Sequence, residues 1–407
     1  MAPIIQSSLD TDYYKVTMGQ AVFRHYRGVD VTYEFINRTK RVSLARFIRE
    51  EDVRRELDHV RTLSFSRDEL AYLKGFGIFG DDYLSFLAEL RLPPYDLQWG
   101  SEVFSLRFRG PWESAIYWEI PALAIVNELY FRSLLEDCDG MERRAVYDLG
   151  RANLARKIAL LREHPYIFFS DFGTRRRAGY AWQAEVARTV ARELPEQFIG
   201  TSDVAIAMRY GLKPSGTSAH EMPMIVAGLY HGVSNYLALA QNEVSRVWWD
   251  MYGYDLSVAL NDTWGSEFFF RTAPPEIARD WKSIRIDSGD PLEEGEKCIR
   301  WYEAYGIDPR TKTLIFSDGL DLPAILRIAA HFRGRIGVVF GWGTNLTNDF
   351  GPKFPPVSIV VKATRANGRG LVKLSNNIAK ATGDPADIEK IMKEVGYTTR
   401  FQEECKY

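Results

Sequence analysis

His220 is the histidine of this sequence best placed to do chemistry. It follows a turn rich in Gly, Ser and Thr in the segment KPSGTSAHE, residues 213–221. A neutral imidazole, with a reference pKa of ~6.5, can act as a base or as a nucleophile toward phosphorus. Asp262, in the segment LNDTW at 260–264, is the candidate to orient its second ring nitrogen. We expect an exposed imidazole among polar groups; the alternative is a histidine satisfied by a local cap.

The segment RIDSGD, residues 285–290, places two carboxylates around a Ser-Gly turn. Asp287 and Asp290 can accept hydrogen bonds from ribose hydroxyls, or bind Mg²⁺ through water, because Mg²⁺ prefers carboxylate oxygens and keeps several waters. Taken alone, the same residues also suit an Asx turn that opens a helix. The metal ligands are therefore left unassigned.

Closely spaced glycines indicate an anion site in the segment FGWGTN, residues 340–345. Gly341 and Gly343 let backbone N–H groups approach a phosphate without a side chain in the way, and Thr344 follows them. Ser317 and Gly319, in the segment SDGLD, offer similar donors after the preceding strand. A pair of glycines is weak evidence by itself, but its position after a late strand favours phosphate binding.

An aromatic side chain and three guanidiniums occur together in DFGTRRR, residues 171–177. Arginine matches phosphate and carboxylate oxygens, and Phe172 can stack on a planar ring. At least one of Arg175, Arg176 and Arg177 is expected to be only a solvated charge. The combination suits a small aromatic acid or a nucleotide.

These segments need strands that bring their ends together. Short runs of Ile, Val and Phe, each closed by Gly, Ser, Thr or Asp, occur at 166–174, 197–204, 256–264, 283–290, 313–321 and 336–345, with a further strand at 357–363. Intervals of 32, 29 and 24 residues separate 170 from 202, 288 from 317 and 317 from 341, which suits strand-helix units of ~30 residues. A β/α barrel collects such residues at the C-terminal ends of its strands. A doubly wound open sheet is the alternative.

The first ~135 residues have a different texture. Helical spacing at 53–63 and 67–73 mixes with extended segments at 31–36 and 103–108, and two longer helices are expected at 123–137 and 143–163. The fold class is therefore α/β, an irregular β/α barrel domain plus an N-terminal α/β domain completed by the C-terminal tail. We assign residues 136–364 to the barrel, and residues 1–135 with 365–407 to the N-terminal domain.

Composition excludes several classes of protein. Lys plus Arg number 52 against 54 Asp plus Glu, so no global basic field favours nucleic acid. The three cysteines, Cys138, Cys298 and Cys405, are far apart and odd in number, which argues against a disulfide framework. Neither a secretory signal nor an apolar run of ~18 residues is apparent. We expect a cytoplasmic protein with no membrane partner.

Taken together, the segments resemble those of the nicotinate phosphoribosyltransferase family, through most of the chain. The motifs that carry the resemblance are LDTDYYKVTM at 9–18, YEFINR at 33–38, SDFGTRR at 170–176, GTSDVAIA at 200–207, KPSGTSAHE at 213–221, IRIDSGD at 284–290, FSDGLD at 316–321, FGWGTN at 340–345 and KLS at 373–375. The resemblance implies formation of nicotinate mononucleotide from nicotinate and phosphoribosyl diphosphate. It also implies ATP and Mg²⁺, with ATP hydrolysis coupled through a phosphohistidine at His220 and Asp262 as its orienting carboxylate.

The resemblance also implies roles for matching positions. Phe172 and Tyr14 would sandwich the pyridine ring, with Tyr14 supplied by the same chain or by the second subunit of a homodimer. Arg285 and Ser202 would lie near the nicotinate carboxylate. The phosphoribosyl part would be held by Arg175 near the phosphates, by Asp287 at the ribose, and by Ser317, Gly319, Gly341, Gly343 and Thr344 at the 5′-phosphate.

Ser202 bears on substrate choice. The related nicotinamide enzyme carries an Asp at what looks like this place, and a carboxylate there would repel the substrate's own carboxylate, whereas a hydroxyl can donate to it. Alternatives are a nicotinamide phosphoribosyltransferase, a quinolinate-type enzyme that works without ATP, and a non-catalytic ligand-binding relative. A glycosidase using Asp287 and Asp290 would leave the glycine-rich loops without a role.

Overall fold

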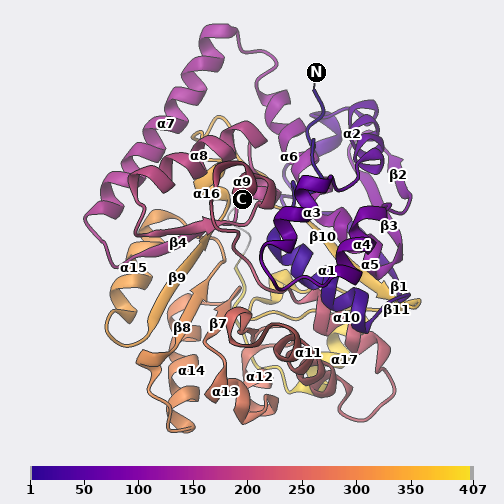
Figure 1. Ribbon diagram of the computed structural model, residues 1–407, viewed down its shortest axis with the longest axis vertical. Coiled ribbons are helices and arrows are strands. Elements are labelled where there is room, and N and C mark those ends of the chain that lie inside the picture. Colours follow the sequence, from indigo (N-terminus) through magenta and orange to yellow (C-terminus); the bar gives the residue numbers. More distant parts are fainter. Residues whose placement is uncertain (1, 404–407) are drawn as a thin grey trace.

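The computed structural model describes residues 2–403, so the position of Cys405 lies outside the described residues. Two sheets organise the chain (Figure 1). The first is antiparallel, in the order β11-β10-β1-β3-β2. Its strands are β1 (Asp30–Asn37), β2 (Tyr95–Trp99), β3 (Phe104–Pro111), β10 (Ile359–Ala366) and β11 (Arg369–Gly370).

Helices of the N-terminal half accompany this sheet, at the right of Figure 1. They are α1 (Tyr13–His25), α2 (Glu50–Thr62), α3 (Arg67–Lys74), α4 (Asp81–Glu89), α5 (Trp112–Ala115) and α6 (Glu119–Leu134). The long α7 (Gly140–Arg162) follows them and lies at the upper left of Figure 1. Local sequence explains their starts: Ser66 with Glu69, and Asp139 with Glu142, form capping boxes at α3 and α7, which satisfy otherwise unpaired N–H groups. The predicted helices and strands of this region are confirmed.

The second sheet is parallel and has the order β5-β4-β9-β8-β7-β6. Its strands are β4 (Phe168–Asp171), β5 (Phe198–Thr201), β6 (Val258–Leu260), β7 (Ser283–Ile286), β8 (Thr313–Phe316) and β9 (Gly337–Trp342). The intervening and following helices are α8 (Tyr180–Glu193), α9 (Val204–Tyr210), α10 (Glu221–Leu229), α11 (Tyr236–Tyr252), α12 (Ser266–Thr272), α13 (Pro275–Asp280), α14 (Pro291–Ala304), α15 (Leu322–Phe332), α16 (Thr344–Thr347) and α17 (Pro385–Val395).

The strand order of the parallel sheet is cyclic: neighbouring strands are consecutive in the sequence, and the first strand lies beside the last. The first strand β4 pairs with the last strand β9, and the remaining strands are neighbours in sequence except at the break between β5 and β6. A doubly wound sheet needs a point at which the order reverses, and the described pairs contain no such point. The α/β class is confirmed, while closure of the ring into a barrel stays a prediction.

The strand expected at 357–363 does not join the parallel sheet. It forms β10, which pairs antiparallel with β1, so yellow β10 lies beside indigo β1 in Figure 1. The predicted domain boundary at 364/365 falls inside this strand. An apolar run alone does not say which sheet a strand enters, because that depends on partners distant in the sequence.

Candidate active site

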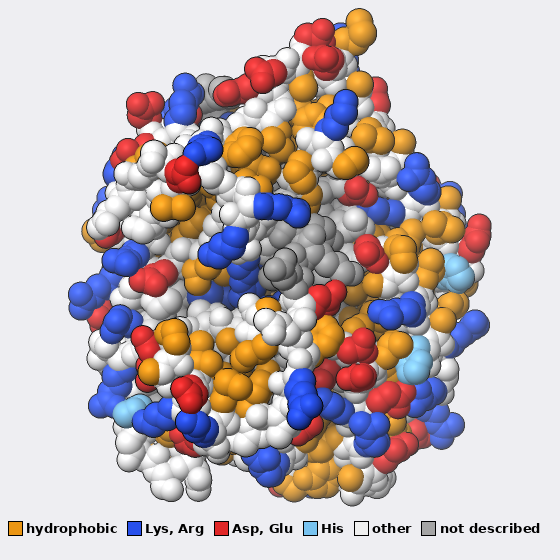
Figure 2. All heavy atoms as spheres, turned by 180° about the vertical axis from the view of Figure 1, so that it is seen from behind, with side chains coloured by type: hydrophobic (Ala, Val, Ile, Leu, Met, Phe, Trp, Pro, Cys, Tyr) orange, Lys and Arg blue, Asp and Glu red, His pale blue; other side chains and the backbone are white. Residues whose placement is uncertain are grey.

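A cavity of ≈ 640 Å³ lies at the C-terminal ends of the parallel strands, between the two sheets. Figure 2 shows a hollow on this face with Lys and Arg side chains gathered in it. Its lining includes almost every residue predicted from the sequence: Tyr14, Phe172, Arg175, Ser202, His220, Arg285, Asp287, Ser317, Gly319, Gly341, Gly343 and Thr344. Asp262 is fully buried and contacts His220 behind the wall.

His220 lies at the start of α10, in the region where β5 and β6 do not pair. The bridge between Thr201 and Pro214 leads the chain toward it. Its Nδ1 is 2.9 Å from the Thr263 hydroxyl, and its Nε2 is 3.2 Å from Asp262 Oδ1. The imidazole is only 4% exposed, so the expectation of an exposed ring is wrong, because residues after β6 pack against it.

Asp262 and Asp287 both face the His220 imidazole. Asp287 Oδ2 is 3.5 Å from Nε2. Burial raises the pKa of Asp262, but the charges of Lys373 and His220 outweigh it and hold that pKa below its ordinary value. Burial also raises the pKa of Asp287. Arg285, His220 and Lys373 together outweigh that effect and hold the pKa well below its ordinary value. Both carboxylates are therefore ionised where they face the imidazole.

The loops after β7 and β8 meet at Asp287. Ser317 Oγ donates to Asp287 Oδ1 at 2.9 Å. Asp290 instead caps α14, since its Oδ1 accepts from the N–H groups of Leu292 and Glu293, both at 2.9 Å. The predicted Asx-type helix start at Asp290 is thus present, while Asp287 remains at the cavity surface.

Gly341 leaves room for the Phe172 ring, which the spacing of the glycines does not predict. A Cβ atom placed there would come within 2.4 Å of the Phe172 ring, so only glycine leaves room for the ring against β9. Gly343 is similarly close to the Phe172 carbonyl, at 3.0 Å from an added Cβ. The glycine-rich loop therefore seats the aromatic residue as well as exposing backbone N–H groups.

The three consecutive arginines have different surroundings. Arg177 is fully buried and bonds to Asp10 at 2.6 and 2.8 Å and to Asp203 at 3.1 Å. Arg175 lines the cavity, lies over the Tyr14 ring at 5.6 Å, and its guanidinium is 3.4 Å from Asp12. Arg176 also lines the cavity. Arg177 is therefore structural, and Arg175 lies at the same end of the cavity as Tyr14.

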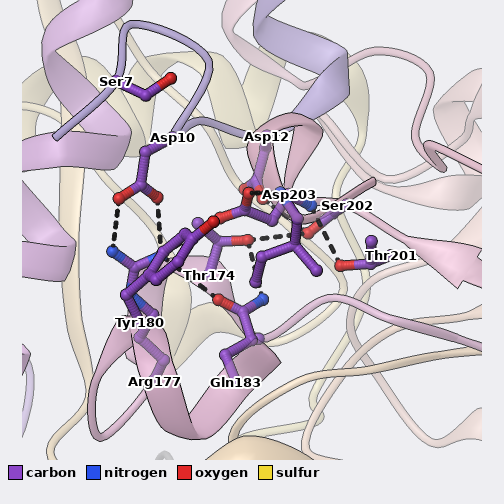
Figure 3. A network of polar contacts seen from close by, with 12 residues as sticks. Ser7, Asp10, Asp12, Thr174, Arg177, Tyr180, Gln183, Thr201, Ser202 and Asp203 are labelled. Carbon is purple, nitrogen blue, oxygen red and sulfur yellow. Dashed lines mark hydrogen bonds and ion pairs between the residues drawn. The ribbon is translucent and has the colours of Figure 1, made fainter. Parts of the chain in front are cut away.

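Ser202 does not offer a free hydroxyl. Its Oγ donates to Asp12 Oδ1 at 2.6 Å and lies 3.2 Å from Thr174 Oγ1 (Figure 3). Three backbone hydrogen bonds hold the N-terminal segment against the end of β5: Tyr13 N–H to Ser202 C=O, Val204 N–H to Thr11 C=O, and Ala205 N–H to Leu9 C=O. The contact places Asp12 and Tyr14 in the cavity of their own chain.

Basic residues that the sequence did not single out line the opposite wall. Arg38, at the end of β1, and Lys362, on β10, come from the antiparallel sheet, and Lys373 and Lys380 follow it. Burial lowers the pKa of Lys362 to about 7, with Lys373, Arg38 and Arg175 acting in the same direction and Glu119 against it. The motifs YEFINR and KLS contain two of these residues, but only the strand pairing shows that they face the site.

Two buried glutamates, Glu119 and Glu221, were also not singled out from the sequence. Lys15 Nζ is 2.7 Å from both Glu119 and Glu221. Glu119 also accepts from the Tyr14 hydroxyl at 3.0 Å, and Glu221 directly follows His220. Lys15 therefore links the tyrosine end of the cavity to the histidine end. The motif LDTDYYKVTM contains Asp12 and Lys15, which was the available signal.

The described residues contain no helix long and apolar enough to cross a membrane. Within the same residues, no group of three or more His, Cys, Asp and Glu side chains is arranged to hold a metal ion.

Comparison with known proteins gives concordant matches over nearly the whole chain. Residues 167–399 match the nicotinate phosphoribosyltransferase (NAPRTase) family, and residues 9–127 match the N-terminal domain of that family. A nicotinate phosphoribosyltransferase from Porphyromonas gingivalis is 32% identical, with a TM-score of 0.87 over 97% of this chain and 100% of that one. One from Vibrio cholerae is 30% identical, with a TM-score of 0.87 over 97% of this chain and 94% of that one.

A putative nicotinate phosphoribosyltransferase from Saccharomyces cerevisiae is 28% identical, with a TM-score of 0.86 over 98% of this chain and 100% of that one. Both family regions and all three structures agree with the family that the sequence motifs indicate. The chain belongs to the nicotinate phosphoribosyltransferase family.

Proposed function

We propose that this protein is an enzyme that forms nicotinate mononucleotide and diphosphate from nicotinate and 5-phosphoribosyl 1-diphosphate, in the salvage of NAD precursors. The observation that carries the proposal is that one cavity of one chain gathers an aromatic clamp, glycine-rich anion loops and His220. Family membership supports the same reaction. We place it in the cytoplasm, with small-molecule substrates and no nucleic-acid or membrane partner.

We assign the pyridine ring to the space between Phe172 and Tyr14, because both side chains border the cavity. Arg285 is the proposed partner of the nicotinate carboxylate, since its Nε is buried and has no hydrogen-bond partner among the described residues. Its Nη1 is held by the carbonyl of Ser218 at 3.0 Å. A positioned guanidinium of this kind binds a carboxylate well.

The phosphoribosyl group is assigned to the other loops. Asp287 is proposed to accept from the ribose hydroxyls, and the 5′-phosphate to bind Ser317, Gly319, Gly341, Gly343 and Thr344. The basic wall, with Lys373 and Lys380, suits the diphosphate. The predicted role of Arg175 near the phosphates stays a prediction.

The reaction is a displacement at the anomeric carbon. The pyridine nitrogen forms the new C–N bond as the C–O bond to diphosphate breaks, so positive charge develops on the ribose and negative charge on the leaving group. Asp287 stabilises the former and the basic wall the latter. Holding both substrates in one enclosed cavity supplies the entropic part of catalysis.

ATP is the proposed cosubstrate, and His220 the residue that its γ-phosphoryl group modifies. Its Nε2 faces Asp262 and Asp287, at 3.2 and 3.5 Å. In the proposed transfer, an N–P bond forms at Nδ1, which gives up its contact with Thr263, as the terminal P–O bond of ATP breaks and ADP leaves. A proton on Nε2 of the phosphorylated ring would then be stabilised by both carboxylates. The phosphorylated ring would order the diphosphate end of the cavity, so that ATP cleavage favours synthesis.

Mg²⁺ fits as a companion of the phosphate groups. It is commonly bound by one or two carboxylates together with substrate phosphates, and Asp287 and Asp290 both border the cavity. We propose these two as its protein ligands; when bound, Mg²⁺ would neutralise charge on the departing diphosphate.

The test is product formation by the purified protein supplied with phosphoribosyl diphosphate, Mg²⁺, ATP and either nicotinate or nicotinamide. Nicotinate mononucleotide from the acid, with little reaction of the amide, is the expected result. Equal or faster reaction of nicotinamide would make the amide enzyme the better assignment. Absence of product from either substrate would favour a non-catalytic ligand-binding relative.

A further inference from the structure

A cluster of paired charges borders the pyridine end of the cavity and continues toward His220. Three carboxylates, Asp12, Glu119 and Glu221, face two cations there. Lys15 lies 2.7 Å from both glutamates, and Arg175 lies 3.4 Å from both Asp12 and Glu119. The charge of Lys362 also acts on Glu119, so the positive and negative charges around the cluster are close to balanced before an anionic substrate enters. Adding a further buried anion to such a cluster is costly unless its charge is compensated.

A chain of hydrogen bonds ends on one of these carboxylates (Figure 3). Arg177 can only donate, and its Nη1 is 3.4 Å from Gln183 Oε1, so the amide nitrogen of Gln183 must face the other way. That nitrogen donates to Thr174 Oγ1 at 3.2 Å. Thr174 lies 3.2 Å from Ser202 Oγ, which in turn donates to Asp12 at 2.6 Å.

The direction of these hydrogen bonds decides whether Ser202 can donate a proton to the substrate. A hydroxyl has one proton to donate, and Ser202 donates its proton to Asp12. While Asp12 is ionised, Ser202 can therefore show only lone pairs to a substrate carboxylate. If Asp12 holds a proton, it can donate to Ser202, and the Ser202 proton can turn to the substrate.

We propose that Asp12 takes up one proton when nicotinate binds, and that its protonated form selects the acid over the amide through Ser202. The proposal rests on the proposed function, and it adds that the nicotinate carboxylate, the proposed partner of Arg285, lies within reach of Ser202, which lines the same cavity. A proton from solvent neutralises Asp12, so the total charge of the cluster is unchanged when the substrate anion arrives. The uncharged amide brings no such charge and requires no proton.

The surroundings of Asp12 favour this protonation. Burial raises its pKa more than Arg175, Ser202 and Thr174 lower it, and the charge of Glu119 raises it further. Burial opposes ionisation of Glu119 as well, but Lys15, Arg175 and Lys362 lower its pKa to about 2. Asp12, rather than Glu119, is therefore the carboxylate of this pair that can accept the proton.

Other groups near Asp12 titrate in the neutral range or above it. Burial raises the pKa of Asp171 to about 6, and burial lowers that of Lys362 to about 7. The Tyr14 hydroxyl has a pKa well above its ordinary value, chiefly because it is buried. The experiment must therefore separate Asp12 from Asp171 and Lys362 by substitution.

The first readout is the KM for nicotinate between about pH 6 and about pH 8, at saturating phosphoribosyl diphosphate and ATP. In the wild-type protein this KM should rise with pH, approaching about tenfold per unit above the pKa of Asp12. Selectivity for nicotinate over nicotinamide should fall in parallel. Asp12→Asn keeps a donor toward Ser202 without a titrating group, so its KM for nicotinate should not depend on this proton.

The second readout is calorimetric titration of nicotinate in two buffers of different ionisation enthalpy, with nicotinamide as control. The wild-type protein should take up close to one proton with the acid and none with the amide. Asp12→Asn should abolish the uptake. If that variant does not fold, Ser202→Ala takes its place and should reduce the uptake. Asp203, which forms a backbone bridge with Asp12, is also fully buried, and burial raises its pKa well above the ordinary value. Uptake that persists in Asp12→Asn would assign the proton to Lys362, Asp171 or Asp203 and overturn the proposal.

Failure of this proposal is distinguishable from failure of the proposed function. A wild-type protein that makes nicotinate mononucleotide but takes up no proton would refute only the role of Asp12. A protein that neither binds nicotinate nor makes product would refute the proposed function itself.

Discussion

At the residue scale, the cavity is defined by how each charge is compensated. His220 is held between Thr263 on one ring nitrogen and two carboxylates on the other. Ser202 is held by Asp12. Charged and polar side chains that are both buried and well paired are pre-organised, so little reorganisation is needed when substrate binds.

Ser202→Asp is expected to reduce selectivity for nicotinate. The new carboxylate would lie beside Asp12 and face the substrate carboxylate, so two like charges would be forced together. Relative kcat/KM for nicotinate and nicotinamide should shift toward the amide by tenfold or more, corresponding to roughly 1.4 kcal/mol. Unchanged relative efficiencies would remove Ser202 from the account of substrate choice.

The lowered pKa of Lys362 predicts that the KM for phosphoribosyl diphosphate depends on pH. With its pKa lowered to about 7 by burial, it is charged below that pH and loses its charge as pH rises through it. The KM for phosphoribosyl diphosphate should therefore rise above about pH 7, and Lys362→Met should raise it at pH 6 and flatten the profile. Lys390→Met, at an exposed position of α17, is the control. An unchanged profile in Lys362→Met would contradict this role.

The sequence predicted the residues at strand ends better than their partners. Phe172 and Asp287 were found because each follows an apolar run that ends at a turn, and His220 because it follows a turn rich in Gly, Ser and Thr. Asp12 was missed because its role depends on a hydrogen bond with Ser202, 190 residues away in the chain. Lys362 was missed because only the pairing of β10 with β1 brings it to the cavity. Local spacing contains no record of such contacts.

At the element scale, the docking of the segment before α1 onto the end of β5 completes the site. The buried Arg177 clamps this junction, since it bonds to Asp10 from the N-terminal segment and to Asp203, which caps α9. Loss of this arginine would leave the buried carboxyl oxygens of Asp10 and Asp203 without the donor that pairs them, which is costly.

Arg177→Met should lower the free energy of unfolding by about 3–5 kcal/mol, the typical cost of breaking a buried ion pair. Denaturant unfolding measures the change. Arg192→Met on α8 is a matched control, because Arg192 is 73% exposed and pairs only at the surface; its effect should stay within about 0.5 kcal/mol. Equal effects of the two substitutions would show that the junction is not held by Arg177.

The apolar runs and their spacing predicted the parallel strands and their common functional edge. They did not predict that the strand at 357–363 enters the antiparallel sheet, where it brings Lys362 to the cavity. Strand type follows from local pattern, but sheet membership depends on pairing between segments more than 300 residues apart, such as Val31 with Ala366.

At the scale of the whole molecule, both sheets of one chain contribute to one cavity. We propose that they define the two domains expected from the sequence, with the C-terminal segment returning to the first. Tyr14 and His220 line the same cavity within a single chain. We propose that each chain supplies its own Tyr14 to the site, within a monomer or a homodimer.

Mixing two defective variants tests this arrangement. If each chain builds its own site, a mixture of Tyr14→Ala and His220→Ala should show no more ATP-stimulated activity than the two variants measured separately. If Tyr14 served a neighbouring subunit, some mixed dimers would contain one intact site. Recovery of ATP-stimulated activity on mixing would therefore contradict the single-chain site.

The most direct test of the central proposal is one reaction measured with and without ATP. The protein receives nicotinate, phosphoribosyl diphosphate and Mg²⁺, and nicotinate mononucleotide and ADP are quantified together. We predict that ATP strongly increases product and is converted to ADP, and that His220→Ala keeps slow transfer but loses the increase. Full ATP stimulation in His220→Ala would contradict the phosphohistidine, and no product with the wild-type protein under either condition would contradict the enzyme itself.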